Sequence, residues 1–177
     1  MTVTLLRHYK VIHLRQRKYT PAGYLIALRE YDEAEVLNQY ITLPNEYQRI
    51  ITSTMKRTQQ TFAFIYGRRK HEKTALLNEV PMMPFTKRNR EYDATFLDVT
   101  ARVQWMFNNR NQPETRKLTI TRAREFIDQY LQDGNSCLII GHGFFLRTLA
   151  KQMLKNGFKG KEIMYIRNGE YHTYTTE

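Results

Sequence analysis

Short apolar runs alternate along this chain with longer segments whose apolar residues recur every three or four positions. The short runs are typical of buried strands and the longer segments of amphipathic helices. Strands are expected at about 2–6, 49–53, 74–77 and 136–140, with edge strands at 163–166 and 171–175 around a turn at Asn168-Gly169. Helices are expected at about 24–40, 54–66, 93–108, 119–133 and 144–155. This alternation predicts a three-layer αβα sandwich whose central sheet is mostly parallel, with an antiparallel edge strand.

Two of the apolar runs end in the same way, at a histidine. Val3-Thr4-Leu5-Leu6 leads to Arg7 and His8, and Cys137-Leu138-Ile139-Ile140-Gly141 leads to His142. In open α/β sheets, ligands bind beyond the carboxyl ends of the strands. If the two strands are neighbours, the histidines therefore meet at one edge of the sheet.

Composition points to an ordinary globular protein. The chain has 177 residues, of which 41% are hydrophobic, so we expect one domain over 1–177 with a sizeable core. The one cysteine excludes an intramolecular disulfide framework. The apolar runs are far shorter than a membrane span, and charged residues interrupt the first run too early for a signal sequence. These features favour a cytoplasmic protein without membrane contact.

The net charge of +11 favours an anionic partner. Phosphorylated metabolites, nucleic acid and acidic proteins would all satisfy it. The chain has no zinc-finger spacing, no RNA-binding aromatic signature and no long basic helix, so nucleic acid is disfavoured. The basic run 87–90 is either a solvated loop or a basic lip that attracts anionic substrates. The sequence leaves a homodimer open.

The polar residues that follow the predicted strands form a coherent set. They are Arg7 and His8 after the first strand, Ser53 and Arg57 after the second, Glu79 after the third, and His142 after the fourth. Arginine forks match phosphate oxygens, and a neutral imidazole can attack phosphorus to form a phosphohistidine. A second, protonated histidine can stabilise the developing charge, and a carboxyl group can protonate the leaving oxygen. This chemistry needs no metal or other cofactor.

Three segments, in order, resemble the sequence blocks of the histidine phosphatase superfamily, also called the phosphoglycerate mutase-like family. They are Leu5-Leu6-Arg7-His8, the run from Ile51 to Thr61 with its serine, arginine and threonine, and the run from Leu138 to Arg147 with its His-Gly pair. Together they span most of the chain. Leu77-Asn78-Glu79-Val80-Pro81 is similar to the short bacterial members, in which a glutamate precedes a proline-containing stretch.

The resemblance implies a role for each residue. His8 would be the phosphorylated nucleophile, Arg7, Arg57 and His142 would form the phosphate pocket, and Glu79 would be the acid and base. Its rivals for that role are Glu72, Glu91 and Asp93. The chain departs from the family at Tyr9, where glycine is usual. Tyr9 would narrow the pocket, stack on a substrate or point away, and Lys10 would add a phosphate contact, as would Ser53.

Three functions follow. The first is a metal-independent phosphomonoester hydrolase of the histidine acid phosphatase type, acting through a phosphohistidine on a small phosphorylated metabolite or a phosphoprotein. It is preferred because the chain is short, whereas the family's mutases resemble longer proteins with an enclosing insertion. The second is a phosphoglycerate mutase-type phosphoryl transferase, with the run 87–90 as its basic clamp. The third is a phosphate-binding regulatory module whose pocket is blocked by Tyr9.

Overall fold

The computed structural model describes residues 1–44 and 46–176 and contains a central sheet of five strands. Their spatial order is β4-β3-β6-β1-β7. The strands are β1 (Thr2–Arg7), β3 (Arg49–Ser53), β4 (Glu72–Thr74), β6 (Cys137–Gly141) and β7 (Tyr171–Thr175). Among the described strands of this sheet, only β7 pairs antiparallel to its neighbour. The predicted mostly parallel sheet with one antiparallel edge strand is thus confirmed.

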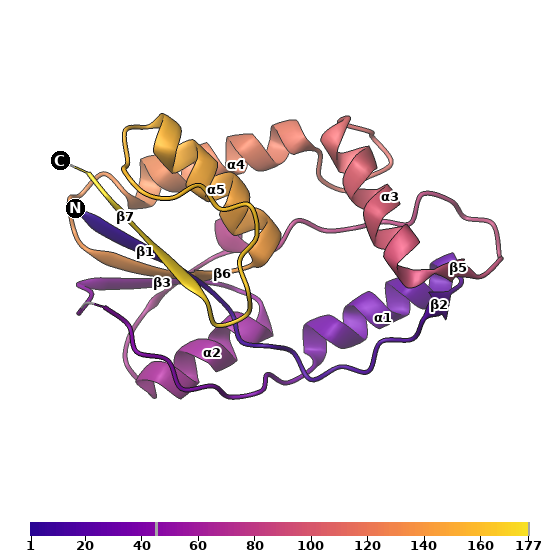
Figure 1. Ribbon diagram of the computed structural model, residues 1–177, viewed down its shortest axis with the longest axis horizontal. Coiled ribbons are helices and arrows are strands. Elements are labelled where there is room, and N and C mark those ends of the chain that lie inside the picture. The colour runs from indigo at the N-terminus through magenta and orange to yellow at the C-terminus, as the bar shows by residue number, and fades with distance from the viewer. Residues whose placement is uncertain (45, 177) are drawn as a thin grey trace.

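Helices surround this sheet (Figure 1). They are α1 (Pro21–Glu33), α2 (Lys56–Tyr66), α3 (Ala94–Met106), α4 (Arg116–Tyr130) and α5 (Gly143–Lys155). Helix α2 covers one face, whereas α4 and α5 cover the other. Helices α1 and α3 extend away from the sheet toward a small two-stranded sheet of β2 (Lys18–Tyr19) and β5 (Tyr92–Asp93). In the described part of the chain, no helix has the length and apolar character needed to cross a membrane.

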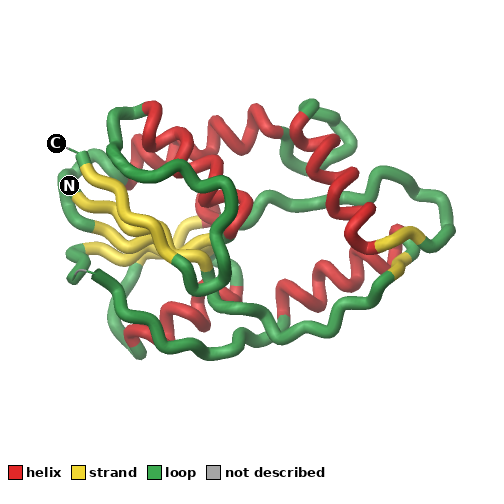
Figure 2. The backbone as a smooth tube through the Cα atoms, in the orientation of Figure 1, coloured by secondary structure: helices red, strands yellow, loops and turns green. Residues whose placement is uncertain are grey.

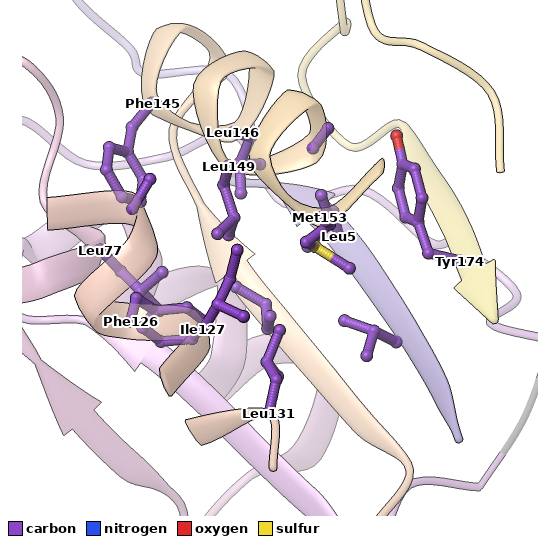
Figure 3. Packing of buried hydrophobic residues seen from close by; sticks show 14 of the residues in the cluster. Leu5, Leu77, Phe126, Ile127, Leu131, Phe145, Leu146, Leu149, Met153 and Tyr174 are labelled. Atoms are coloured by element: carbon purple, nitrogen blue, oxygen red, sulfur yellow. The ribbon is translucent and has the colours of Figure 1, made fainter. Parts of the chain in front are cut away.

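Alternation along β1 explains why both faces of the sheet are covered. Leu5 lies in the large core cluster beneath α4 and α5, together with Phe126 and Leu149 (Figure 3). The next residue, Leu6, lies in the cluster on the α2 side, where it joins Phe62. A strand that is buried on both faces reads as a continuous apolar run, which is the pattern found before His8.

The first helix ends earlier than its periodicity predicts. Helix α1 stops at Glu33, and Ala34 is already extended with φ −70° and ψ 160°. The chain then pairs with the segment that follows β1, since Ile12 N donates to Glu35 O at 2.7 Å and Leu37 N donates to Lys10 O at 2.7 Å. Val36 and Leu37, which were expected to continue the helix, therefore lie in this pairing, whereas Tyr40 is exposed.

Two other expectations need correction. The run 74–77 is not a strand, because β4 ends at Thr74 and a 3₁₀ turn, η1 (Ala75–Leu77), follows; the Thr74 hydroxyl accepts from the Leu76 backbone. The run 163–166 is buried at Ile163 and Ile166 without forming a strand. In both places the apolar signal reported burial rather than strand pairing.

The carboxyl ends of β1, β3 and β6 point toward the side where α1 and α3 lie (Figure 2). Both termini lie at the opposite end of the sheet, where Thr2 pairs with Thr175. The residues that follow these strands consequently face the region between the sheet and the α1–α3 extension.

Candidate active site

The two strands that end in histidine are neighbours. Strands β1 and β6 pair in parallel with Arg7 opposite Gly141, and the His8 backbone N–H donates to the Gly141 carbonyl at 3.0 Å. The ring centroids of His8 and His142 are 5.1 Å apart. Sheet topology thus places both imidazoles at one edge, as expected from the ends of the two strands.

Hydrogen bonding leaves His8 with a free lone pair on one ring nitrogen. Its Nδ1 lies 2.6 Å from the carbonyl oxygen of Tyr9, and because a carbonyl only accepts, Nδ1 donates. The side chain is 2% exposed. Burial, followed by the positive charge of Arg57, lowers the pKa of His8 well below its usual value of 6.5. The ring is therefore neutral at pH 7, and Nε2 carries the lone pair.

His142 is held through both of its ring nitrogens. Arg57 Nε donates to its Nδ1 at 3.1 Å, so the proton of the neutral ring lies on Nε2, which donates to Ser53 Oγ at 2.7 Å. Burial and then the positive charges of His8 and Arg57 lower the pKa of His142 well below 6.5. Burial and these two hydrogen bonds favour the neutral ring in the free protein, and a nearby anion would favour the protonated ring that the sequence assigns to charge stabilisation.

Ser53 is buried, and its hydroxyl group contacts other side chains of the protein. Its side chain is fully buried, and its hydroxyl also contacts Thr58 Oγ1 at 2.8 Å. Because Ser53 ends β3, next to β6, it lies beside the histidine that follows β6. The structure therefore places Ser53 as the partner of His142.

The guanidinium of Arg57 is buried in the same cluster, with 3% of the side chain exposed. Besides its bond to His142, Nη1 donates to Asp32 Oδ1 at 2.6 Å and Nη2 lies 3.4 Å from Met55 Sδ. Arg57 is the second residue of α2, which begins at Lys56, just after β3. A strand end and the following helix thus bring the arginine beside His142.

Arg7 contributes a second guanidinium, packed against Gly143. A Cβ on Gly143 would lie 3.0 Å from both Cζ and Nε of Arg7, so only glycine leaves this space. Arg7 Nη1 donates to the Ile166 carbonyl at 2.8 Å. Its Nε is buried and has no hydrogen-bond partner among the described residues. A buried donor without a partner is costly, so an anion placed against this N–H would stabilise the site.

Glu79 lies at the first turn of α5, immediately after His142. Its Oε1 accepts from the backbone N–H groups of Val80 at 2.9 Å and Phe145 at 3.0 Å, and its Oε2 accepts from Phe144 at 3.2 Å. The carboxylate therefore satisfies donors at the start of the helix, where negative charge is favoured. This contact explains how a residue beyond β4 reaches the strand end of β6.

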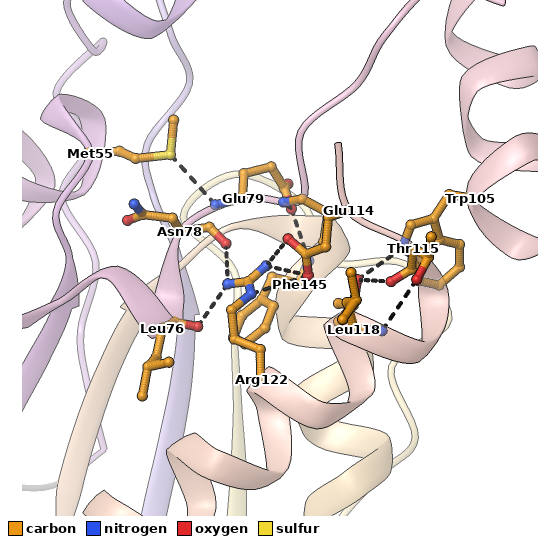
Figure 4. A network of polar contacts seen from close by, with 12 residues as sticks. Met55, Leu76, Asn78, Glu79, Trp105, Glu114, Thr115, Leu118, Arg122 and Phe145 are labelled. Carbon is orange, nitrogen blue, oxygen red and sulfur yellow. Dashed lines mark hydrogen bonds and ion pairs between the residues drawn. The ribbon is translucent and has the colours of Figure 1, made fainter. Parts of the chain in front are cut away.

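Arg122 of α4 fixes the segment that carries Glu79 (Figure 4). Its Nη1 donates to the carbonyl oxygens of Leu76 and Asn78, each at 2.8 Å. Its guanidinium lies 4.1 Å from the centroid of the Phe145 ring and pairs with Glu114 at 3.0 Å. One side chain thus links the Glu79 segment to the first turn of α5.

The rival acids occupy other places. Glu72 pairs with Arg49 at 2.7 Å, and Asp93 accepts from the first N–H groups of α3 as its N-cap. Glu91 is exposed beside β5. Of the four candidate acids, Glu79 is the one bonded to the helix that begins beside His142.

Tyr9 and Lys10 do not join this cluster through their side chains. The Tyr9 ring packs with Val11 and Val36 and meets Phe64 edge-on at 5.9 Å. Tyr9 contributes its carbonyl to His8, while its ring points into this separate core, which matches the last of the three alternatives, that the ring points away. Lys10 is exposed, and its carbonyl belongs to the pairing with Leu37.

Two residues at the site were missed by the sequence analysis. Asp32 pairs with Arg57, and the Arg57 guanidinium lies 5.2 Å from the centroid of the Tyr31 ring. Both belong to the last turn of α1, where an acidic residue is unfavourable for the helix dipole. The acidic residue at the end of α1 was the only sequence signal for this pair. Its partner could not be predicted, because it depends on how α1 docks against α2.

The fold and the site define an α/β protein with paired histidines at the carboxyl ends of two parallel strands. The family model of the histidine phosphatase superfamily (branch 1) matches residues 3–177, and the chain belongs to this superfamily. No curated protein matches the chain.

Solved structures, several of them phosphatases, share the fold. The protein from the open reading frame Rv3214 of Mycobacterium tuberculosis is 16% identical with a TM-score of 0.59, covering 99% of this chain and 91% of that one. A putative alpha-ribazole-5'-P phosphatase from Escherichia coli is 16% identical with a TM-score of 0.57, covering 100% and 95%. Phosphoserine phosphatase from Entamoeba histolytica, in complex with 3-phosphoglyceric acid, is 15% identical with a TM-score of 0.55, covering 97% and 89%. At these identities the likeness establishes the fold alone.

Proposed function

We propose that the protein is a metal-independent phosphomonoester hydrolase that acts through a phosphohistidine at His8. The observation that carries the proposal is the state of His8. Its Nδ1–H is bonded to the Tyr9 carbonyl and its pKa is lowered by burial, so a neutral ring offers the Nε2 lone pair at pH 7. This is the form that a nucleophilic imidazole needs.

In the first half-reaction, Nε2 of His8 attacks phosphorus and the bond to the ester oxygen breaks. Glu79, which enters this step as the neutral carboxyl group, passes its proton to that oxygen, and the alcohol leaves. We assign this proton to Oε2, because it accepts one hydrogen bond at 3.2 Å whereas Oε1 accepts two shorter ones. In the second half-reaction, Glu79 takes a proton from water, the oxygen attacks phosphorus, and the P–N bond breaks to release phosphate and neutral His8.

Charge on the transferred group would be stabilised by two arginines and His142. The partnerless Nε of Arg7 supports its assignment to phosphate, because an oxygen of the substrate would satisfy it. Binding of a dianion would raise the pKa of His142 toward its usual value and favour a second proton, taken from solvent, on Nδ1 in place of the hydrogen bond from Arg57 Nε. The resulting imidazolium would stabilise the transition state more strongly than the neutral ring.

The direct test is hydrolysis of p-nitrophenyl phosphate by the wild type and by His8→Ala. We expect activity in the wild type, at least about a thousandfold loss in the variant, and an acid-labile phosphoenzyme in the wild type alone. A panel of phosphoserine, 3-phosphoglycerate, glucosyl-3-phosphoglycerate and α-ribazole 5'-phosphate follows from the similar phosphatases. Absence of activity across the panel would reject the hydrolase, and an undiminished rate in His8→Ala would reject the nucleophile.

The same assay distinguishes the proposed hydrolase from the two alternatives, a mutase and a regulatory module. A mutase would convert 3-phosphoglycerate to 2-phosphoglycerate, whereas a phosphatase releases only phosphate. The residues of the run 87–90 are exposed, which supports a solvated loop over a substrate clamp. The blocked regulatory module depended on the Tyr9 ring entering the pocket, and the burial of that ring in another cluster removes its basis.

A further inference from the structure

Arg57, one of the two arginines assigned to phosphate, already forms an ion pair within the protein. Asp32 Oδ1 accepts from Arg57 Nη1 at 2.6 Å, while Nε is used by His142. With Met55 Sδ beside Nη2, each of the three guanidinium nitrogens has a neighbour within the protein. A bound phosphate must therefore share Arg57 with the carboxylate of Asp32.

Burial differs sharply between the two partners. Arg57 is 3% exposed and fixed beneath the Tyr31 ring, whereas the Asp32 side chain is 45% exposed. The carboxylate therefore reaches the buried cation from the solvent side. It neutralises a charge that would otherwise be costly to bury, and its exposure leaves it free to swing away.

The placement of Asp32 follows from how two helix ends meet. The carbonyl end of α1, with Asp32 in its last turn, lies against the start of α2, where Lys56 Nζ donates to the Glu33 carbonyl at 2.5 Å. An acid at the end of a helix is unfavourable for that helix, and a cation from the neighbouring helix compensates. The ion pair between Asp32 and Arg57 therefore stabilises the free protein. It also places a negative charge beside the phosphate pocket.

We propose that Asp32 competes with phosphate for Arg57, and so weakens the binding of phosphoester and inorganic phosphate while it stabilises the unliganded site. The inference rests on the proposed function, because it takes Arg57 as a phosphate ligand. A dianion beside Asp32 meets like charge that only partly reaches solvent. The inorganic phosphate left after hydrolysis meets the same repulsion, which promotes its release.

The test compares Asp32→Asn with Glu33→Gln, which changes net charge equally from the same helical turn. Glu33 contacts α2 through its backbone carbonyl, so its side chain serves as a matched control. Titration calorimetry with inorganic phosphate should show about tenfold tighter binding in Asp32→Asn. Glu33→Gln should bind like the wild type, and KM for p-nitrophenyl phosphate should fall in Asp32→Asn alone.

A second measurement separates competition from simple structural support. Without phosphate, Asp32→Asn should melt several degrees below the wild type, because Arg57 loses its counter-charge. Saturating phosphate should close this gap, since phosphate replaces the missing anion. A purely structural role would lower the melting temperature in both conditions without tightening phosphate binding.

Several results would overturn the proposal. Unchanged or weaker phosphate binding in Asp32→Asn would do so, as would an equal gain in Glu33→Gln, or no measurable binding by either wild type or Asp32→Asn. Hydrolysis by the wild type with unaltered phosphate affinity in Asp32→Asn rejects only the competition. Tighter binding in Asp32→Asn without hydrolysis by the wild type rejects only the proposed function.

Discussion

The guanidinium of Arg7 lies against the Cα of Gly143, where a methyl group would approach Cζ and Nε to 3.0 Å. We expect Gly143→Ala to push Arg7 aside and to lower kcat/KM for p-nitrophenyl phosphate about 10- to 100-fold, because small displacements of a charged group are costly in catalysis. The matched change Gly23→Ala in α1, whose new methyl would meet Thr20 Oγ1 at 3.3 Å, should leave kcat/KM nearly unchanged. Equal activity in both variants would show that Arg7 needs no fixed position.

The role of Glu79 can be tested through the leaving group. Glu79→Gln keeps an oxygen that accepts from the start of α5 but cannot deliver a proton. With an alkyl phosphate, we expect kcat to fall about 10²- to 10⁴-fold. With p-nitrophenyl phosphate, whose phenolate leaves without protonation, the first step should be much less affected. Glu72→Gln, which removes a partner of Arg49, is the control for activity. Equal losses of the first step with both substrates would contradict general acid catalysis.

Stability should depend on pH through the two buried histidines. Burial lowers the pKa of both His8 and His142 in the folded state, so the unfolded chain binds protons more readily than the folded chain. Their contribution is therefore present above pH 6.5 and is lost as pH falls below it. The slope cannot exceed about 1.4 kcal/mol per pH unit for each histidine.

Urea unfolding between pH 5 and 8 measures this effect. The wild type should lose stability on the acid side, and His8→Gln with His142→Gln should flatten the profile. His71, whose pKa is lowered by burial as well, contributes to what remains in the double variant. A wild-type profile that is flat between pH 5 and 7 would contradict the neutral state assigned to the free site.

Tyr9 offers a test of where its ring lies. Its hydroxyl is buried without a hydrogen-bond partner among the described residues, and burial raises its pKa to about 12. Removal of an unsatisfied buried hydroxyl should stabilise the fold, so we expect Tyr9→Phe to gain about 1 kcal/mol in free energy of unfolding. Its kcat/KM should match the wild type. A loss of activity above tenfold would mean that the hydroxyl reaches the substrate.

The sequence predicted the features that depend on strand ends. A strand that is buried on both faces ends where its apolar run ends in the sequence. The positions of His8, Ser53 and His142 at strand ends could therefore be predicted from the pattern. Arg57 and Glu79 were also singled out by their positions after the predicted strands, and the family resemblance added a role for each. The direction of the Tyr9 side chain could not be predicted from the sequence. Tyr9 lies past the last residue of β1, where pairing with the segment after α1 sets the direction of the side chain.

Asp32 could not be predicted for a related reason. Its importance comes from the docking of α1 on α2, and periodicity extended that helix beyond Glu33. Local pattern does not contain the competing contact between Val11 and Val36, which ends the helix. Where two segments that are distant in sequence determine each other's course, the periodicity of either one alone is insufficient.

Arg122 has a consequence for how sequence variation in this protein should be interpreted. It contacts the carbonyl oxygens that precede Glu79 and stacks on Phe145, although its own charge is directed to Glu114. A substitution there would shift the acid and the helix after His142 together. In a mutational scan scored by turnover, Arg122 would therefore rank with the reacting groups themselves, and only a comparison with abundance in the cell would reveal it as part of the scaffold.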